Sequence, residues 1–240
     1  MKNALALVVV AGLASSAFAT STMSIMSSVN GGAFAADNNV NTGDVVRVRV
    51  MIGTDIAAAV GLSGATYKLT ASNFSDSSLA PWSVSGPSTD PLGPGVQDLV
   101  NGNGRLAPFA ASAATAVPTS SLAAGVLTIG GSGTGGRIAS GQNAPSLAGT
   151  RFETDNPVAI FQFTFTVGSA YNLGDVITVS ITDFLNATTT GARWYNNIGG
   201  TTAVNDPNPV LRSGTLTFVP TPGALALLGL GGLVAGRRRR

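Results

Sequence analysis

Val45-Val46-Arg47-Val48-Arg49-Val50-Met51-Ile52 is the stretch of sequence that decides the fold. Its even-numbered residues are all apolar and β-branched, whereas two of its odd-numbered residues are arginines. A period of two puts the apolar side chains on one side of an extended chain and the charged ones on the other. The stretch therefore predicts a β-strand with one face in a hydrophobic core and the other toward water.

The same period recurs later in the chain. Residues 158–167 are the strongest candidate for a core strand, because Phe161, Phe163, Phe165 and Val167 occupy alternate positions and share one face. Residues 176–182 alternate in the same way. Shorter apolar runs predict further strands at residues 23–29, 65–70, 125–129, 193–195 and 215–219.

Turn-forming residues separate these segments, and no segment shows a convincing amphipathic helical period. Short strands joined by Gly, Pro and Asn turns predict an all-β fold, a single antiparallel β-sandwich of the jelly-roll kind. We expect this domain to span residues 20–219. It would follow an N-terminal signal helix at 1–19 and precede a C-terminal hydrophobic helix within 220–240. Turn chemistry is expected at 37–44, a loop at 205–209 and a turn or two of helix within 107–121.

The Gly-Asp pairs that precede two of the predicted strands resemble a feature of a known fold. Gly43-Asp44 precedes the strand at 45–52, and Gly174-Asp175 stands between the phenylalanine-rich strand and the strand at 176–181. This order resembles the sandwiches of cohesins and carbohydrate-binding modules. The resemblance implies a fold and indicates no particular ligand.

Composition narrows the possible functions. The 240 residues include no Cys and no His, which excludes disulfides, thiol chemistry and histidine-based catalysis. Five of the 13 Lys and Arg lie at the chain ends, which leaves eight against 11 Asp and Glu and a body with net charge −3. Such a body offers no basic patch for nucleic acid. We therefore predict a protein that is not an enzyme and that has no cofactor and no nucleic-acid partner.

Other patterns that could carry chemistry favour a plainer interpretation. Residues 131–136 have the spacing of a nucleotide-binding glycine loop, but no helix of sufficient length fits after them, so a flexible loop is expected. Glu153 and Asp155 are an alternative, a carboxylate pair for glycoside hydrolysis, whose separation the sequence does not give. Calcium binding competes with turn capping at four loop aspartates: Asp37, Asp44, Asp175 and Asp183.

The N-terminal segment has the three parts of a secretory signal. Lys2 gives a positive start, residues 4–13 are apolar, and Ala17-Phe18-Ala19 forms a small-residue cleavage site. Cleavage after Ala19 makes Thr20 the first residue of the mature chain.

The C-terminal segment also has three parts in a fixed order. A proline-bounded turn, Val219-Pro220-Thr221-Pro222, is followed by an uncharged apolar run and by Arg237, Arg238, Arg239 and Arg240. Arginines do not cross a bilayer readily, so this order predicts a stop-transfer segment with everything before it outside the membrane. The apolar residues that form the membrane segment include Gly223, Leu225, Leu227, Leu228, Leu230, Leu233 and Val234.

This order of motif, apolar run and arginine cluster resembles the PEP-CTERM sorting tail of Gram-negative bacteria. The family has a glutamate at the centre of the motif where this chain has Thr221, so the tail resembles a Pro-Thr-Pro variant. The resemblance implies processing by an exosortase-type membrane enzyme and delivery to the cell surface or exopolysaccharide. It also implies at least transient anchoring in the membrane.

The chain has few aromatic residues, and most of them are needed in the core. Core or edge packing is therefore the favoured explanation for Trp82, Trp194 and Tyr195, and stacking on a sugar is the alternative. We predict an exported, surface-sorted, non-catalytic protein with a structural or adhesive role in the envelope or exopolysaccharide matrix. The alternative is a carbohydrate-binding module, with or without calcium, whose partner is a polysaccharide.

Overall fold

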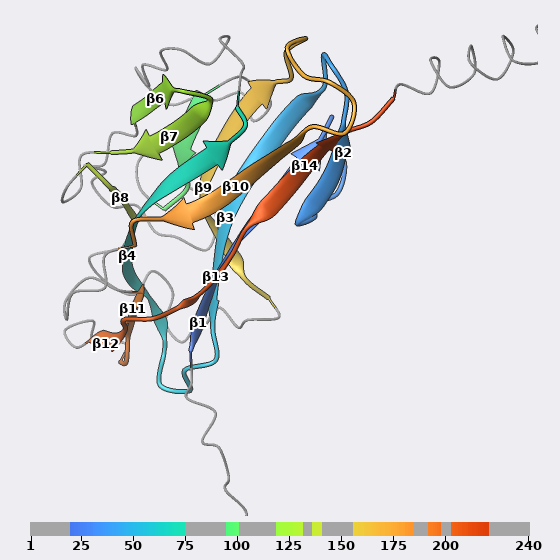
Figure 1. Cartoon of the computed structure of the whole chain (residues 1–240). Helices are drawn as coiled ribbons and strands as arrows, with labels where there is room; N and C mark the ends of the chain where they lie inside the picture. Colours follow the sequence, from blue (N-terminus) through green and yellow to red (C-terminus); the bar gives the residue numbers. More distant parts are fainter. Residues whose placement is uncertain are drawn as a thin grey trace, which may run out of the picture.

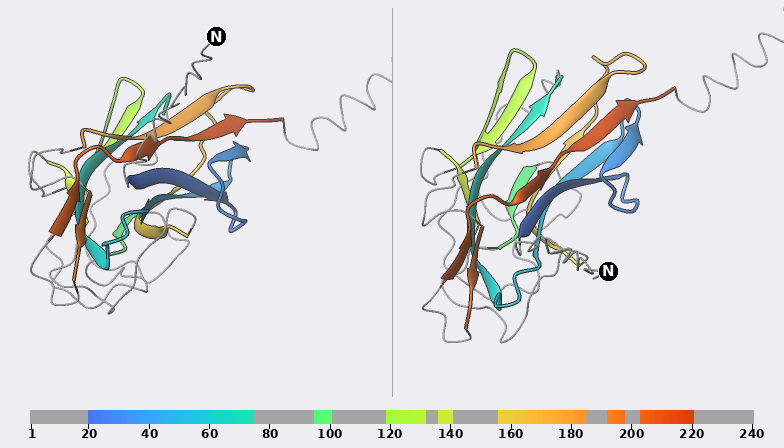
Figure 2. Two further views of the ribbon diagram at one scale, coloured as in Figure 1. Left: turned by 90° about the horizontal axis from the view of Figure 1, so that it is seen from below. Right: turned by 60° about the horizontal axis from the view of Figure 1, so that its bottom comes forward.

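The computed structural model describes residues 20–74, 95–100, 119–131, 136–140, 156–184, 192–197 and 203–220. All elements in these ranges are β-strands, and they form two sheets that face each other around one core (Figures 1 and 2). The all-β prediction is therefore confirmed. The helices expected at the two ends lie outside the described residues, and the expected helical turn at 107–121 lies almost entirely outside them.

The first sheet has five strands in the order β13-β1-β3-β9-β5. Its central strands pair antiparallel, and the expected strand at 45–52 forms the middle of the sheet. The strands are β1 (Ser21–Val29), β3 (Val45–Thr54), β5 (Gly95–Asp98), β9 (Val158–Thr166) and β13 (Val210–Arg212).

The second sheet has nine strands, of which six follow the order β12-β11-β4-β10-β14-β2. Its longest strand is β4 (Gly61–Ser72), which also pairs with β7 and β8, and β7 pairs in turn with β6. The remaining strands are β2 (Asp37–Val40), β6 (Thr119–Ala123), β7 (Val126–Gly130), β8 (Ile138–Ser140), β10 (Val176–Thr182), β11 (Ala192–Tyr195), β12 (Ala203–Asp206) and β14 (Gly214–Phe218).

The alternating runs of the sequence supply the core. The even-numbered residues of β3 from Val46 to Ile52 are all buried. The first three pair with the phenylalanines of β9, and Ile52 pairs with Val158. Phe165 stacks on Phe163 and meets the edge of Phe74, with ring centroids 6.0 and 5.2 Å apart. Burial of each side chain of this size contributes about 1.5–3 kcal/mol to the stability of the folded state. The two predicted strands therefore supply a large part of the hydrophobic core.

The same four-residue turn opens a central strand in each sheet. Asn41 donates its backbone N–H to the Asp44 carboxylate at 2.7 Å, and Asn172 donates its own to Asp175 at the same distance. The glycines at the third position, Gly43 and Gly174, have φ of 89° and 86°, a conformation that glycine adopts without strain. The turns expected before these two strands are therefore confirmed.

Two pairings at the sheet edges are parallel, which corrects the expectation of an antiparallel sandwich. β13 runs parallel to β1, and β2 runs parallel to β14. β2 covers residues expected to form a turn, and the amide of Asn38 donates to the Ser27 carbonyl at 2.7 Å. The expected loop at 205–209 is also shortened, since β12 extends to Asp206 and β13 begins at Val210.

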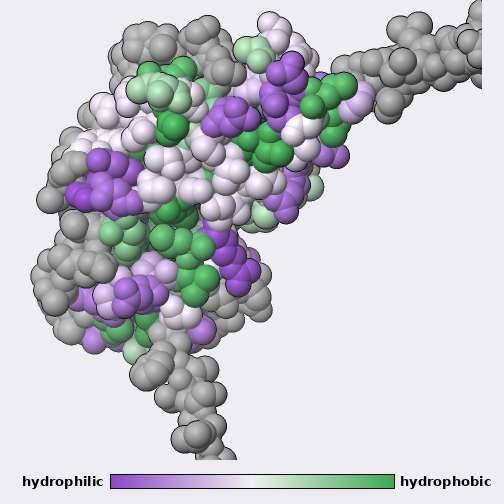
Figure 3. Space-filling view, viewed as in Figure 1, coloured by the Kyte–Doolittle hydropathy of each residue, from purple (hydrophilic) through white to green (hydrophobic). Residues whose placement is uncertain are grey.

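Small hydroxyl side chains cover the outer face of the nine-stranded sheet. Four of these side chains form a rank, a row of cross-strand neighbours on β6, β7, β4 and β10. At the β10 end of the rank, the Ser180 hydroxyl lies 2.8 Å from the Ser213 hydroxyl. Figure 3 shows this face as mostly pale, the colour of intermediate hydropathy. The members of the rank are Ser121, Thr128, Thr70 and Ser180.

Candidate functional site

A groove forms where β13 leaves the five-stranded sheet. β13 pairs with β1 only from Thr22 to Ser24, and the chain then crosses through Ser213 into β14 of the other sheet. The edge of β1 finds its next partner at Ser27, which exchanges backbone hydrogen bonds with Ala35 at 2.7 and 2.9 Å. The interval between these pairings leaves a gap along β1.

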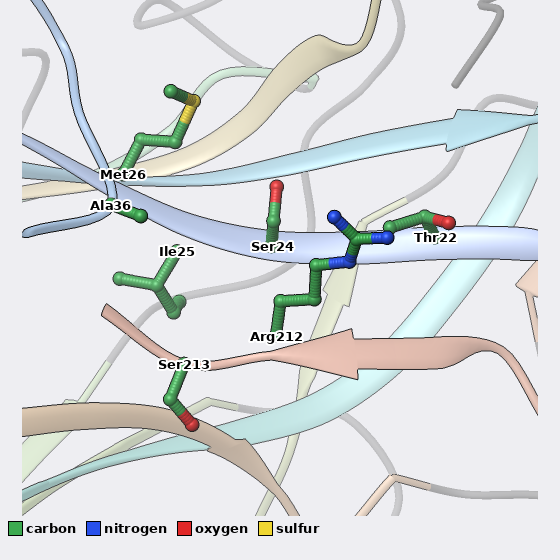
Figure 4. Close-up of a pocket in the computed structure, with 7 residues that line it drawn as sticks. All are labelled: Thr22, Ser24, Ile25, Met26, Ala36, Arg212 and Ser213. Atoms are coloured by element: carbon green, nitrogen blue, oxygen red, sulfur yellow. The ribbon is translucent and has the colours of Figure 1, made fainter. Parts of the chain in front are cut away.

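The groove has a volume of about 360 Å³, within the range of small-molecule sites. In Figure 4 the guanidinium of Arg212 extends over β1 between the side chains of Thr22 and Ser24. The groove is lined by Thr22, Ser24, Ile25, Met26, Ala36, Arg212 and Ser213.

The charge of this region is positive. Arg212 is exposed, and it forms no hydrogen bond or ion pair with the part of the chain that the structure describes. Its paired residue Ser24 is two positions from Met26, which pairs with Arg49, so both arginines lie on the outer face of the sheet. The sequences of β1, β3, β9 and β13 include no Asp or Glu. An unpaired guanidinium beside two hydroxyls can bind a carboxylate or phosphate through paired N–H donors.

Arg49 belongs to the same face but has partners of its own. Its Nε donates to Gln162 at 2.8 Å, and its guanidinium carbon lies 4.3 Å from the centre of the Phe34 ring. Burial lowers the pKa of Arg49, and the positive charge of Arg47 lowers it further. Arg47 itself has a buried Nε without a hydrogen-bond partner. The arginines on this face of the sheet thus lie near one another, and no carboxylate from β1, β3, β9 or β13 neutralises them.

The burial of Trp194 and Tyr195 favours core packing over contact with a ligand. Trp194 is 0% exposed, and its indole Nε1 donates to the Ser21 hydroxyl at 2.8 Å, while Tyr195 is 6% exposed. Both therefore pack in the interior, where β11 pairs with the start of β4 and Trp194 reaches the start of β1. Trp82 lies outside the described residues.

The structure does not bring together the four aspartates considered for calcium. Asp44 and Asp175 cap their turns, Asp37 accepts from the Thr215 hydroxyl at 2.5 Å, and Asp183 pairs with Lys68 and Arg137. Turn capping is therefore the observed role of two of them. No group of three or more acidic side chains with a metal-binding arrangement occurs among the described residues.

Of the terminal sequence signals, the structure describes Val219 and Pro220. Val219 donates its N–H to the Val40 carbonyl at 3.2 Å. Val219 and Pro220 are both half-buried. The remaining signal-peptide, sorting, membrane-segment and arginine positions lie outside the described residues. Within the described ranges there is no helix with the length and hydropathy required to cross a bilayer.

Sequence reasoning missed Arg212 as a functional candidate. It lies in a three-residue strand, Val210–Arg212, that follows an expected loop and has no alternation. The signal that singles it out is the parallel pairing with β1, which brings together residues that are far apart in the sequence.

Comparison with known proteins gives structural neighbours but no sequence relatives. No family model and no curated protein matches the chain. The solved structures that resemble it include cohesin modules. The third cohesin of ScaC from Acetivibrio cellulolyticus, solved with the ScaB dockerin, is 10% identical over 83% of this chain and 100% of that one, with TM-score 0.34. A type III cohesin module from the cell-surface anchoring scaffoldin ScaE of Ruminococcus flavefaciens is 9% identical over 84% and 89%, with TM-score 0.35.

The sixth cohesin of Acetivibrio cellulolyticus scaffoldin B, solved with a Cel5 dockerin, is 12% identical over 83% of this chain and 99% of that one, with TM-score 0.33. Scores of this size do not define a shared function. The function is therefore argued from the residues of this chain alone.

Proposed function

We propose that this chain is an exported, surface-sorted, non-catalytic β-sandwich with a structural or adhesive role in the bacterial envelope or exopolysaccharide matrix. Residues 1–19 act as the signal peptide, residues 20–219 form the exported domain, and residues 220–240 are the sorting and membrane tail. The observation that carries the proposal is the pair of terminal signals on either side of an all-β body.

The structure supports the position of the second boundary. β14 ends at Phe218, and the last backbone hydrogen bond of the sheet is donated by Val219. The Pro-Thr-Pro motif therefore begins immediately after the final strand, where an exosortase-type enzyme can reach it without unfolding the sandwich.

Deletion of residues 220–240 tests this proposal in the native host. The truncated protein is expected in the culture medium, whereas the intact protein stays with the surface fraction. Replacement of Lys68 by Gln serves as a matched control for loss of positive charge, and it should leave retention unchanged. Surface retention of the truncated protein at the intact level would contradict the proposal. Intact mass of the surface form reports both processed ends.

The groove favours a second candidate function, binding of an acidic polysaccharide. The unpaired Arg212 guanidinium and the hydroxyls of Thr22 and Ser24 match a sugar that carries a carboxylate and hydroxyls. The Arg212→Gln variant should bind a uronate-containing polysaccharide at least several-fold more weakly at low salt. Lys68→Gln, with the same charge change on the other sheet, should bind like the unaltered protein. Equal binding by all three proteins would exclude the groove as the site.

A further inference from the structure

The start of β1 is held by two aspartates from distant parts of the chain. The N–H of Thr20 donates to the carboxylate of Asp55, which follows β3. The carboxylate of Asp206, at the end of β12, accepts from the N–H of Ser21 and from the Thr20 hydroxyl, the latter at 3.2 Å. Asp55 thus lies at the Thr20 nitrogen, and Asp206 lies at the Thr20 hydroxyl and the next backbone N–H.

The carbonyl side of Thr20 is fixed as well. Its oxygen accepts from the N–H of Asp55 at 3.1 Å and from the Thr54 hydroxyl at 3.4 Å. Asp206 is fixed in turn, because its second oxygen accepts from the N–H of Asn208 at 3.1 Å. The position of the Thr20 nitrogen relative to the two carboxylates is therefore set by several independent contacts.

Among the described residues, no cation pairs with these two carboxylates. Asp206 is only 8% exposed, and a carboxylate at this depth is stabilised by a partner of opposite charge. Both ion pairs within the described residues involve Asp183, so neither Asp55 nor Asp206 has a countercharge there. The site therefore has room for a positive group that no residue in the described part of the chain supplies.

We infer that Asp55 and Asp206 form a binding site for the α-ammonium group of Thr20, created when the signal peptide is removed after Ala19. The inference rests on the proposed export. Hydrolysis of the Ala19–Thr20 peptide bond consumes one water, leaves a carboxylate on Ala19 and turns the Thr20 amide nitrogen into an ammonium with three N–H donors. The amide has one hydrogen to donate, whereas the ammonium also supplies the missing charge.

A consequence is that processing stabilises the fold. A group that binds only the folded chain raises its stability, and the new ammonium is tethered at the site, so it acts without dilution. The precursor lacks this interaction and is the less stable form. The site therefore favours a loosely folded chain before export and a firmly folded one after it.

The chain allows this to be tested at a single amine. The sequence has only two lysines, Lys2 and Lys68, and Lys2 leaves with the signal peptide. In a Lys68→Arg background the exported protein therefore carries the Thr20 α-amine as its one reactive amine. Intact mass first establishes that the purified chain begins at Thr20, and mild acetylation then removes only that charge.

Thermal unfolding is compared for free and acetylated protein, with Asp206 present and with Asp206→Asn. Acetylation should lower Tm by about 2–4 °C or more when Asp206 is present, and by clearly less in the Asp206→Asn variant. Asp183→Asn, a carboxylate that does not contact Thr20, is the matched control and should leave the full effect of acetylation in place. The α-amine of the folded protein should also react several-fold more slowly than that of the protein in denaturant.

The outcomes separate this inference from the proposed export. A first residue other than Thr20 overturns both the processing site and the inference. A chain that begins at Thr20, but that loses the same Tm on acetylation with and without Asp206, overturns the inference alone. If the Asp206→Asn variant does not fold, the reaction rate of the amine decides, and equal rates in folded and denatured protein would overturn the inference.

Discussion

The two sheets share a core but present different outer faces. In the five-stranded sheet, β9 is buried on both faces from Ala159 to Phe165, including the polar Gln162 and Thr164. In the nine-stranded sheet, β10 is buried at alternate positions only, and the positions between them are open to solvent. The first sheet carries arginines on its outer face, whereas the second carries the rank of serines and threonines.

The difference shows what an alternating pattern does and does not specify. Both strands alternate in sequence, and in both the apolar positions point to the shared core. The pattern does not reveal what covers the opposite face. On β9 the side chain of Arg49, from the neighbouring strand, donates a hydrogen bond to Gln162 on this face.

The largest expected effect tests whether the two sheets are one unit. Phe165→Ala removes a fully buried ring that contacts Phe163 in one sheet and Phe74, just after β4 of the other. We expect a loss of about 3–5 kcal/mol in the free energy of unfolding, measured by denaturant titration. Thr166→Ala, the exposed neighbour, should change it by less than about 0.5 kcal/mol. Two separate transitions instead of one would show that the sheets unfold independently.

The next effect is expected at the crossing between the sheets. Gly214 lies at the start of β14, and a Cβ there would stand 2.9 Å from the Ala36 carbonyl oxygen and 2.9 Å from Cγ2 of Ile25. Gly214→Ala should therefore destabilise the protein by about 1–3 kcal/mol, because backbone must shift. Gly64→Ala is the control, since its nearest contact is 3.6 Å away. Similar Tm values for the two variants would mean that the crossing is loosely packed.

A smaller effect distinguishes the two arginines of β3. Arg49→Ala loses the hydrogen bond to Gln162 and the contact with the Phe34 ring, so we expect a loss of about 1 kcal/mol. Arg47→Ala loses a side chain whose Nε has no partner and removes a like charge, so its effect should be nearer zero. Denaturant titration of both variants checks this, and a larger loss for Arg47→Ala would reverse our assignment of the two side chains.

The smallest effect is electrostatic and lies on the second sheet. Hydrogen bonds from Arg137 and then Lys68 lower the pKa of the exposed Asp183. A lowered folded-state pKa gives stability that is present above the ordinary value of about 3.9 and is lost as the pH falls through the folded value. Asp183→Asn should therefore lower the stability slightly at pH 7, flatten the stability profile below about pH 4 and leave the stability in stronger acid unchanged. An unchanged acid profile would show that the ion pairs are screened by solvent.

Much of the core could be predicted from the sequence, and the candidate site could not. The period of two predicted β3 and β9 together with their buried residues, and the Gly-Asp pairs predicted the turns before β3 and β10, because these signals are local. The parallel pairing of β13 with β1 has no local signal, since β13 is a short exposed strand.

Trp194 shows the same limit for side chains. Its aromatic ring fits either a core or a sugar-binding face, and only the pairing of β11 with β4 decides between them. The hydrogen-bond acceptor of the Trp194 indole is Ser21, which is far away in the sequence. The composition and spacing around residue 194 therefore do not identify this contact.

The two parallel pairings also set the order in which the protein can fold. Thr22 pairs with Val210, and Asp37 pairs with Thr215, so the first strands to be synthesised close the sheets only with the last ones. Contacts this distant in sequence form slowly because a long loop must be closed first. A chain emerging from the ribosome therefore lacks β13 of the first sheet and β14 of the second until synthesis is almost complete.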